Sequence, residues 1–338
     1  MDTLWPRGFV LPYLDSFARP INYLRISVTD RCNLRCVYCM PPQGIELRAH
    51  SEILTFEEIA RLVGVAATLG ITKIRLTGGE PLARLGLPDL VRLIAAIPGV
   101  DDIAMTTNGT LLARHADVLA AAGLRRVNVS LDTLRPERFH QITRRGTLTD
   151  VWAGIEAAQR AGLRPIKLNN VVIRGLNEDE VTDFARMTLA HPWNVRFIEV
   201  MPLGANAAWA GDGYVPMAEV RARIEALFGA LEPAGEPAGN GPARYFRIPG
   251  AAGTLGFITP VSEHFCFSCN RLRLTADGKL RPCLLSDAEI DLRTPLRAGA
   301  TQQELAELLL SGIRVKPEGH DLAGGKVPVT RVMAEIGG

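Results

Sequence analysis

The chain has 338 residues, of which 47% are hydrophobic and 22% charged, so it can bury a large core in one or two domains. Lys and Arg number 38 against 36 Asp and Glu, and the net charge of +2 excludes a general attraction to nucleic acid or to an anionic membrane. No window approaches the ~20 apolar residues that span a bilayer, and residues 1–7 lack the layout of a secretory signal, so we expect a cytoplasmic protein.

Residues 21 to about 200 alternate short β-branched runs with helical patterns, which is typical of βα units in a parallel sheet. The predicted strands are Tyr23–Val28, Lys73–Thr77, Asp102–Thr106, Arg126–Ser130, Ile166–Ile173 and Val195–Val200. A helix predicted over Thr55–Leu69 opens with a capping box of Thr55 and Glu58, and Asn177 followed by Glu180 predicts another helix start of this kind. About six such units are too few for a closed eight-stranded barrel, so an α/β fold with an open barrel or a doubly wound sheet fits.

The composition changes after residue 202, and short strand patterns with few long helices follow. The run 233–242 is rich in Pro and Gly, which predicts a flexible surface loop. We therefore predict a first domain over residues 1–204 and a C-terminal region over residues 205–338 that packs on it.

A cysteine triplet with the spacing C-x3-C-x2-C follows the first predicted strand: Cys32, Cys36 and Cys39. Cytoplasmic thiols stay reduced, so metal ligation or catalysis is their expected use, and parallel α/β folds place active sites at this end of a strand. Three close thiolates suit an iron–sulfur cluster or a zinc ion, but zinc needs a fourth ligand, and neither His50 nor another nearby residue is well placed. A four-iron cluster on three cysteines leaves one iron open to a ligand.

This spacing, with Tyr38 before the last cysteine, resembles the radical S-adenosylmethionine superfamily. The resemblance implies that the open iron chelates S-adenosylmethionine and that a 5′-deoxyadenosyl radical is released. The superfamily's second signature is a glycine-rich turn after the second strand, and Thr77-Gly78-Gly79-Glu80-Pro81 stands there. Glycine permits close backbone approach to the ligand, and Glu80 is placed to meet its ammonium group.

The remaining cysteines form C-x2-C-x13-C: Cys266, Cys269 and Cys283. They suit a second cluster, or a zinc site completed by His264. Arg271 and Arg273 lie between them, and in a strand the two side chains point to the same side. Since arginine suits bidentate recognition of phosphate, the pair predicts an anion site beside the metal.

Three cations stand within predicted core strands: Arg25, Arg75 and Lys167. A charge is costly in such a position, so these residues indicate an anionic substrate. The chain has no G-x-x-x-x-G-K-[ST] loop, because Gly324-Gly325-Lys326 is followed by Val327. A nucleotide bound here is therefore predicted to be a substrate held by side chains.

Residues 24–41, 74–81 and 265–283, with the final Gly337-Gly338, resemble the GTP 3′,8-cyclase family of molybdenum-cofactor biosynthesis. The resemblance covers nearly the whole chain. It implies an incomplete (βα)6 TIM-like barrel closed at its base by an α+β C-terminal region, with two 4Fe-4S clusters facing each other across a basic cavity. The adenosyl radical would take hydrogen from C3′ of GTP, and C3′ would then attack C8 of guanine. One further electron gives (8S)-3′,8-cyclo-7,8-dihydroguanosine 5′-triphosphate.

The resemblance also implies which residues contact each ligand. The S-adenosylmethionine contacts are Tyr38, Gly79, Ser130 and Met201. The GTP contacts are Arg25, Arg75, Thr106, Lys167, Arg271, Leu272 and Arg273, with Thr107 as the alternative to its neighbour. The tail Gly337-Gly338 is expected to reach into the active site.

As partners, the resemblance implies GTP as substrate, an external one-electron donor, a homodimer, and cyclic pyranopterin monophosphate synthase as the next enzyme. One alternative is a radical enzyme that modifies peptides and carries an auxiliary cluster, although such enzymes usually have more C-terminal cysteines. Another is an iron–sulfur or zinc protein without turnover. That alternative gives the Gly-Gly-Glu-Pro turn and the core-strand cations no purpose.

Overall fold

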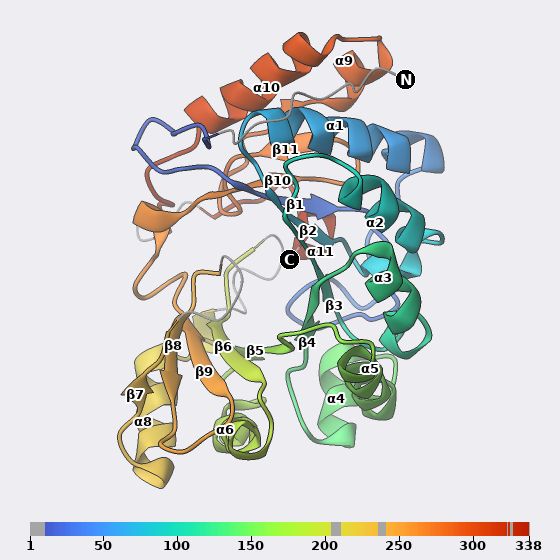
Figure 1. Cartoon of the computed structure of the whole chain (residues 1–338). Helices are drawn as coiled ribbons and strands as arrows, with labels where there is room; N and C mark the ends of the chain where they lie inside the picture. The colour runs from blue at the N-terminus through green and yellow to red at the C-terminus, as the bar shows by residue number, and fades with distance from the viewer. Residues whose placement is uncertain (1–10, 204–210, 236–240, 323, 325–326, 338) are drawn as a thin grey trace.

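The computed structural model describes residues 11–203, 211–235, 241–322, 324 and 327–337. The described strands form one sheet in the order β12-β11-β10-β1-β2-β3-β4-β5-β6-β9-β8-β7, and this order has two ends, so the sheet is not closed (Figure 1). The strands are β1 (Tyr23–Ser27), β2 (Lys73–Thr77), β3 (Asp102–Thr107), β4 (Arg126–Ser130), β5 (Lys167–Val172), β6 (Asn194–Glu199), β7 (Glu232–Pro233), β8 (Arg244–Arg247), β9 (Thr254–Ile258), β10 (Arg271–Leu274), β11 (Lys279–Arg281) and β12 (Ile290–Asp291).

The centre of the sheet is parallel from β10 through β1–β6 to β9. The flanking strands pair antiparallel: β11 and β12 beyond β10, and β8 and β7 beyond β9. Both edges of the six-strand core are thus extended by the C-terminal region. The predicted partial barrel is confirmed, whereas the division at residue 204 stays a prediction.

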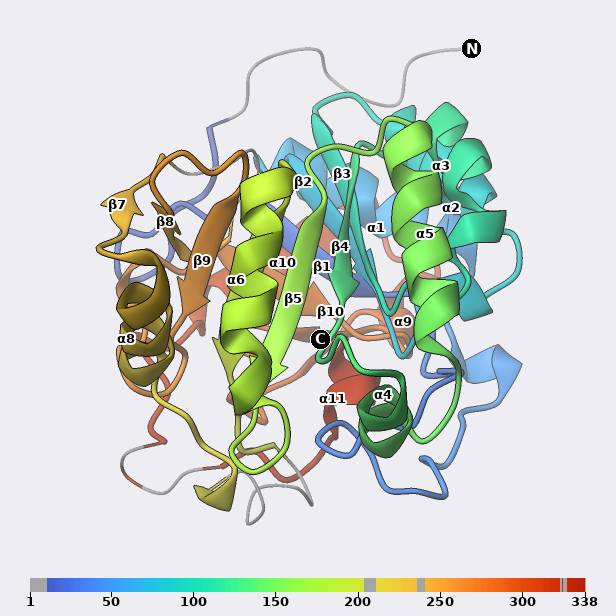
Figure 2. The same cartoon turned by 90° about the horizontal axis from the view of Figure 1, so that it is seen from below.

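Helices cover the outer face of the sheet (Figure 2). The short helix α11 (Met333–Ile336) lies instead on the interior side, where Met333 lines a cavity. The other helices are α1 (Phe56–Thr68), α2 (Leu87–Ala95), α3 (Ala116–Ala122), α4 (Pro136–Thr143), α5 (Leu148–Arg160), α6 (Val181–Ala190), α8 (Met217–Phe228), α9 (Arg293–Arg297) and α10 (Gln302–Arg314). Alternate strand residues such as Leu24 and Ile26 face these helices and join Ile59 and Leu62 of α1 in one buried core. The other face of each central strand is therefore left for the interior of the barrel.

The six strands predicted from sequence match β1–β6 to within one residue at each end. The capping box at α1 is also confirmed, because Thr55 Oγ1 accepts from the N–H of Glu58 at 3.2 Å and Glu58 Oε2 accepts from the N–H of Thr55 at 2.8 Å. In the described part of the chain, no helix is both long enough and apolar enough to cross a membrane.

The capping box predicted at Asn177 and Glu180 is wrong. Asn177 Oδ1 accepts from the N–H of Ile173 at 2.7 Å, and Glu180 accepts from Thr133 Oγ1 at 2.6 Å and from the N–H of Leu134 at 2.7 Å. A short 3-10 turn, residues 178–180, precedes α6 instead. Both side chains tie the loops after β4 and β5 together, so neither is available to cap the helix.

The loop predicted over residues 233–242 lies only partly within the described residues. Residues 232–233 form the short strand β7, and residues 236–240 lie outside the described residues.

Candidate active site

The first cysteine triplet lies in the loop after β1, at the carboxyl end of the parallel strands. The N–H of Leu34 donates to Cys32 Sγ at 3.4 Å, and the N–H of Cys39 donates to the Cys36 carbonyl at 3.0 Å. Burial raises the pKa of the Cys32 thiol to about 11 and that of Cys39 to about 12, and the proximity of Cys32 contributes to the second shift. Thiolates are costly here without positive charge, so a cationic iron cluster fits this donor set.

The Gly-Gly-Glu-Pro turn packs directly on the cysteine loop. The N–H of Gly79 donates to the Thr29 carbonyl and the N–H of Glu80 donates to the Arg31 carbonyl, both at 2.8 Å. A Cβ at Gly78 would lie 2.7 Å from the Thr29 oxygen, and one at Gly79 would lie 2.4 Å from the Arg31 oxygen. Only glycine permits this approach of the two loops.

Glu80 is buried at the centre of this junction. Its carboxylate accepts from Thr107 Oγ1 at 2.7 Å, from the N–H of Asn108 at 2.7 Å and from the N–H of Leu82 at 3.0 Å. Burial raises the pKa of Glu80 to about 7, although these hydrogen bonds oppose the shift. The carboxyl group therefore holds the ends of β2 and β3 together and changes its ionisation near neutral pH, and a ligand cation would stabilise the ionised form.

Asp132, which the sequence analysis missed, lies beside the predicted S-adenosylmethionine contacts. Tyr38 donates its hydroxyl to Asp132 Oδ2 at 2.7 Å, and the N–H of Val171 donates to Oδ1 at 2.9 Å. Burial raises the pKa of Asp132 to about 6. The only sequence signal for Asp132 is its position two residues after Ser130, where the strand β4 ends. Ser130 is half-buried.

The second cysteine triplet and the arginine pair line one cavity. The walls are Met201, Pro260, His264, Phe265, Cys266, Cys269, Arg271, Arg273, Pro282, Cys283, Leu284, Leu285, Lys316 and His320. Lys316, also missed from the sequence, donates its Nζ to the Arg271 carbonyl at 2.9 Å and to the Pro282 carbonyl at 2.7 Å. In the described part of the chain, no three His, Cys, Asp or Glu side chains, His264 included, are arranged to hold a single metal ion.

The charges around the second triplet favour thiolates. Burial raises the pKa of Cys266, and the neighbouring thiols of Cys283 and Cys269 add to this shift. Burial also acts to raise the pKa of Cys269, but Arg271 and Lys316 outweigh it and the net pKa is lowered. Three mutually close thiols beside two cations fit a second thiolate-bound iron–sulfur cluster.

The predicted substrate cations meet in the interior of the barrel. In the strand register, Arg25 pairs with Arg273 of β10 on one side and with Arg75 of β2 on the other. Burial first, and then Arg273 and Arg75, hold the pKa of Arg25 well below its usual range, and burial with Arg271 lowers that of Arg273 to about 10. This row of guanidiniums repels itself, and a polyanion would relieve the repulsion.

A second cavity, next to the first, opens onto this row. Met201, Arg271 and Arg273 line both cavities, while Arg25 and Arg75 line the second. Leu272 points to the opposite face of β10 and is fully buried in the core, so its side chain is turned away from both cavities.

Arg196 of β6 belongs to the same interior and was missed from the sequence. Its buried side chain lines the second cavity, its Nε and Nη2 have no hydrogen-bond partner among the described residues, and burial lowers its pKa. The signal that identified Arg25 and Arg75, a cation within an otherwise apolar strand, was available for Arg196 as well. Lys167 is also buried, with its Nζ 5.8 Å from the centre of the Tyr245 ring.

The two neighbouring threonines at the end of β3 have different roles. Thr107 donates its hydroxyl to Glu80, whereas the buried Oγ1 of Thr106 has no partner among the described residues. Thr106 alternates with Thr107 along the strand and pairs in register with Asn128, which lines the second cavity. The geometry thus favours Thr106 over Thr107 as a ligand contact.

The last described residues also enter the site. Arg273 donates to the carbonyl of Gly337. The backbone of Ala334 lies near Cys39 and acts to lower the pKa of that thiol, against the larger effect of burial. Met333 lines the second cavity. Gly338 lies outside the described residues, so the expectation for the tail is tested here only as far as Gly337.

The comparisons with known proteins place this geometry in a class and then in a family. The chain matches the family model described as the Radical SAM superfamily over residues 26–188, and the one described as Molybdenum Cofactor Synthesis C over residues 193–322. It is a radical S-adenosylmethionine protein by its fold and its first triplet.

Full-length relatives define the family more narrowly. The chain is 57% identical to the GTP 3′,8-cyclase of Pelotomaculum thermopropionicum over 96% of this chain and 99% of the relative. It is 55% identical to that of Moorella thermoacetica, with the same coverage of both chains. The chain belongs to the GTP 3′,8-cyclase family. This membership decides against the peptide-modifying and non-catalytic alternatives.

Solved structures agree on the fold alone. SuiB of Streptococcus suis, crystallised with S-adenosylmethionine, matches with a TM-score of 0.60 at 12% identity, over 83% of this chain and 66% of that one. The protein anSMEcpe with bound AdoMet matches with a TM-score of 0.52 at 15% identity, over 89% of this chain and 79% of that one.

Proposed function

We propose that this chain converts GTP to (8S)-3′,8-cyclo-7,8-dihydroguanosine 5′-triphosphate, the first step of molybdenum-cofactor biosynthesis. The observation that carries the proposal is the row of Arg273, Arg25 and Arg75 in the barrel interior, next to the second cysteine triplet, in a chain with almost no net charge overall. Arg273 and Arg75 are buried, and Arg25 is half-buried. A triphosphate is an anion of the size and charge that such a row requires.

The two triplets hold the two 4Fe-4S clusters. At the first, the backbone of Gly79, the carboxylate of Glu80 and the residues Tyr38, Ser130 and Met201 bind S-adenosylmethionine. When bound, the first cluster and S-adenosylmethionine supply a 5′-deoxyadenosyl radical, which can take a hydrogen atom from C3′ of the ribose.

The cations orient the substrate. Arg25, Arg75, Lys167 and Arg196 bind the triphosphate in the barrel interior. Thr106 offers a hydroxyl that no other described residue binds. Arg271 and Arg273 lie where the two cavities meet, so the guanine base extends from them toward the second triplet. This arrangement places C3′ of the ribose on the side of the first triplet and keeps C8 of guanine within reach of C3′.

The product is an isomer of GTP. The hydrogen atom removed from C3′ is replaced by one electron and one proton after C3′ bonds to C8, so an external one-electron donor is required. The homodimer, the transfer of product to cyclic pyranopterin monophosphate synthase and the cytoplasmic location stay predictions.

The test is anaerobic incubation of the reconstituted protein with S-adenosylmethionine, a strong reductant and GTP, with ATP as the matched control. We expect GTP-dependent 5′-deoxyadenosine and a new nucleotide with the mass of GTP. Formation of 5′-deoxyadenosine with no change in GTP would contradict the proposed substrate.

A further inference from the structure

The C-terminal segment, residues 327–337, connects parts of the site that belong to different elements. Gly337 accepts from Arg273 of the cation row, and the backbone of Ala334 lies near Cys39 of the first triplet. A Cβ on Gly337 would lie 2.9 Å from Thr77 Cγ2, so the segment fits closely between the ends of β1 and β2. Its helix, α11, has four residues and is too short to be stable by itself.

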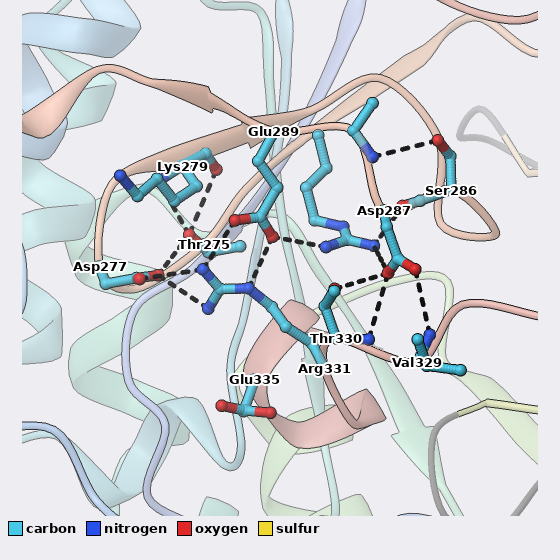
Figure 3. Close-up of polar contacts among 12 residues, drawn as sticks. Thr275, Asp277, Lys279, Ser286, Asp287, Glu289, Val329, Thr330, Arg331 and Glu335 are labelled. Atoms are coloured by element: carbon cyan, nitrogen blue, oxygen red, sulfur yellow. Dashed lines mark hydrogen bonds and ion pairs between the residues drawn. The ribbon is translucent and has the colours of Figure 1, made fainter.

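One buried arginine anchors this segment to the turn between β10 and β11 and to the loop between β11 and β12 (Figure 3). Arg331 Nη1 and Nη2 donate to the two carboxylate oxygens of Asp277 at 3.1 and 3.0 Å. Its Nε and Nη2 donate to the two oxygens of Glu289 at 2.6 and 2.9 Å. A single guanidinium thus binds two carboxylates, each through both oxygens, which is the strongest geometry available to an arginine.

A second connection holds the two residues directly before Arg331. Asp287 Oδ2 accepts from the N–H of Val329 at 3.1 Å, and Oδ1 accepts from the N–H of Thr330 at 3.3 Å. The fully buried Arg281 donates to Glu289 and lies 3.8 Å from Asp287, so it joins the two connections. We call these five residues the tail clamp: Asp277, Arg281, Asp287, Glu289 and Arg331.

The clamp is nearly balanced in charge, with Asp277 and both arginines buried, Glu289 partly buried and Asp287 exposed. Arg331 is 7% exposed and Arg281 is 0% exposed. Two cations face three carboxylates, and Arg48 approaches Asp277 at 3.4 Å. Removing one partner from such a network leaves an uncompensated buried charge, so the network is intolerant of single losses.

We propose that Arg331, bound between Asp277 and Glu289, is the positioning residue that holds the C-terminal segment in the active site. The inference rests on the proposed function. Arg331 touches neither triplet nor either cavity, so it acts on the substrate only through the segment it anchors. Through this segment, the clamp holds Gly337 against Arg273 and Ala334 near Cys39.

The test compares holoenzymes of Arg331→Gln, Arg331→Lys, Glu289→Gln and the control Arg160→Gln. Arg160 is an exposed residue of α5 whose ion pair with Glu156 spans 3.9 Å. The first readout is amide hydrogen exchange without GTP. We expect residues 329–337 to exchange roughly tenfold faster or more in Arg331→Gln, with the barrel strands unchanged. Arg331→Lys and Glu289→Gln should show smaller effects, since each keeps part of the network.

The second readout is turnover with iron content measured alongside. We expect Arg331→Gln to keep the iron of both clusters and to lose cyclisation about tenfold or more, with Arg331→Lys partly restored and Arg160→Gln unchanged. Unchanged exchange in residues 329–337 would overturn the proposal. If amide exchange were accelerated equally throughout the chain in both Glu289→Gln and Arg331→Gln, the proposal would also be overturned, because Arg331 would then only stabilise the fold. A wild-type protein that fails to cyclise GTP would contradict the proposed function instead, because the exchange readout uses no GTP.

Discussion

Arg75 and Arg196 are buried side chains whose Nε atoms have no hydrogen-bond partner among the described residues. An unsatisfied buried donor lowers the free energy of unfolding by about 1–3 kcal/mol. These two arginines therefore reduce the stability of the protein as long as no ligand accepts their hydrogen bonds. Such a cost is typical of a site shaped for a ligand rather than for the fold alone.

At Arg271 and Arg273, we expect substitution to separate two activities. Arg271→Ala and Arg273→Ala should each lower GTP cyclisation by about 10- to 100-fold or more, because each loses charge-assisted hydrogen bonds to the nucleotide. Cleavage of S-adenosylmethionine under strong reductant should continue in both. The control is Arg244→Ala, an exposed arginine of β8 paired with Glu263. Cyclisation at the wild-type rate in either variant would remove that residue from the substrate site.

Glu80 gives a pH dependence with a definite sign. Because burial raises its pKa to about 7, the carboxyl is mostly protonated below that pH and ionised above it. The ionised form attracts the ammonium group of S-adenosylmethionine, so affinity should increase about tenfold between about pH 6 and about pH 8. Equilibrium dialysis of the reconstituted protein measures this, and Glu80→Gln should bind more weakly with a flat profile. The same slope in the variant would assign the titration to another group.

At the scale of elements, the loops after β1 and β2 form one unit. The N–H groups of Gly79 and Glu80 donate to the cysteine loop, and the glycines leave no room for a Cβ. The loop that carries the first cysteine triplet and the turn proposed to bind S-adenosylmethionine are therefore fixed to each other by backbone contacts.

Gly79→Ala should separate these loops, because its Cβ would lie 2.4 Å from the Arg31 carbonyl oxygen. We expect cleavage of S-adenosylmethionine to fall about tenfold or more, since a small displacement at a reacting centre has a large effect on rate. The matched control is Gly211→Ala, where an added Cβ would meet nothing within 4 Å. Wild-type cleavage in Gly79→Ala, measured as 5′-deoxyadenosine, would show that this approach is not needed.

The local elements could largely be predicted from the sequence. Parallel strands buried on both faces are continuous apolar runs, so β1–β6 were located to within one residue. A helical segment does begin after Asn177, but the predicted capping box is wrong because the Asn177 side chain bonds to the backbone of Ile173, Val171 and Asp132 instead. The residues Arg331, Asp277 and Glu289 gave no sequence signal, because the clamp partners lie 54 and 42 positions apart along the chain.

At the scale of the whole molecule, the N-terminal barrel strands and the C-terminal region share one sheet (Figure 1). β9 pairs with β6 and β10 pairs with β1, both in parallel, and α10 packs on α1. These pairings join distant parts of the chain, so periodicity along the sequence could not predict them.

A fragment of residues 1–204 should therefore not behave as an independent domain. Its two edge strands, β1 and β6, would expose unpaired backbone groups and apolar side chains, and we expect aggregation when it is examined by size-exclusion chromatography. The full chain, prepared identically, is the control. A monodisperse fragment with a cooperative unfolding transition would instead support the predicted division at residue 204.

In the proposed reaction, GTP lies between the two triplets with C3′ directed to the first. The most direct measurement uses GTP carrying deuterium at C3′, followed by mass analysis of the 5′-deoxyadenosine formed in anaerobic turnover. We expect 5′-deoxyadenosine heavier by one deuterium, together with a cyclised nucleotide that has lost the label. Unlabelled 5′-deoxyadenosine formed alongside the cyclised nucleotide would contradict it, because hydrogen would then have been taken from another position.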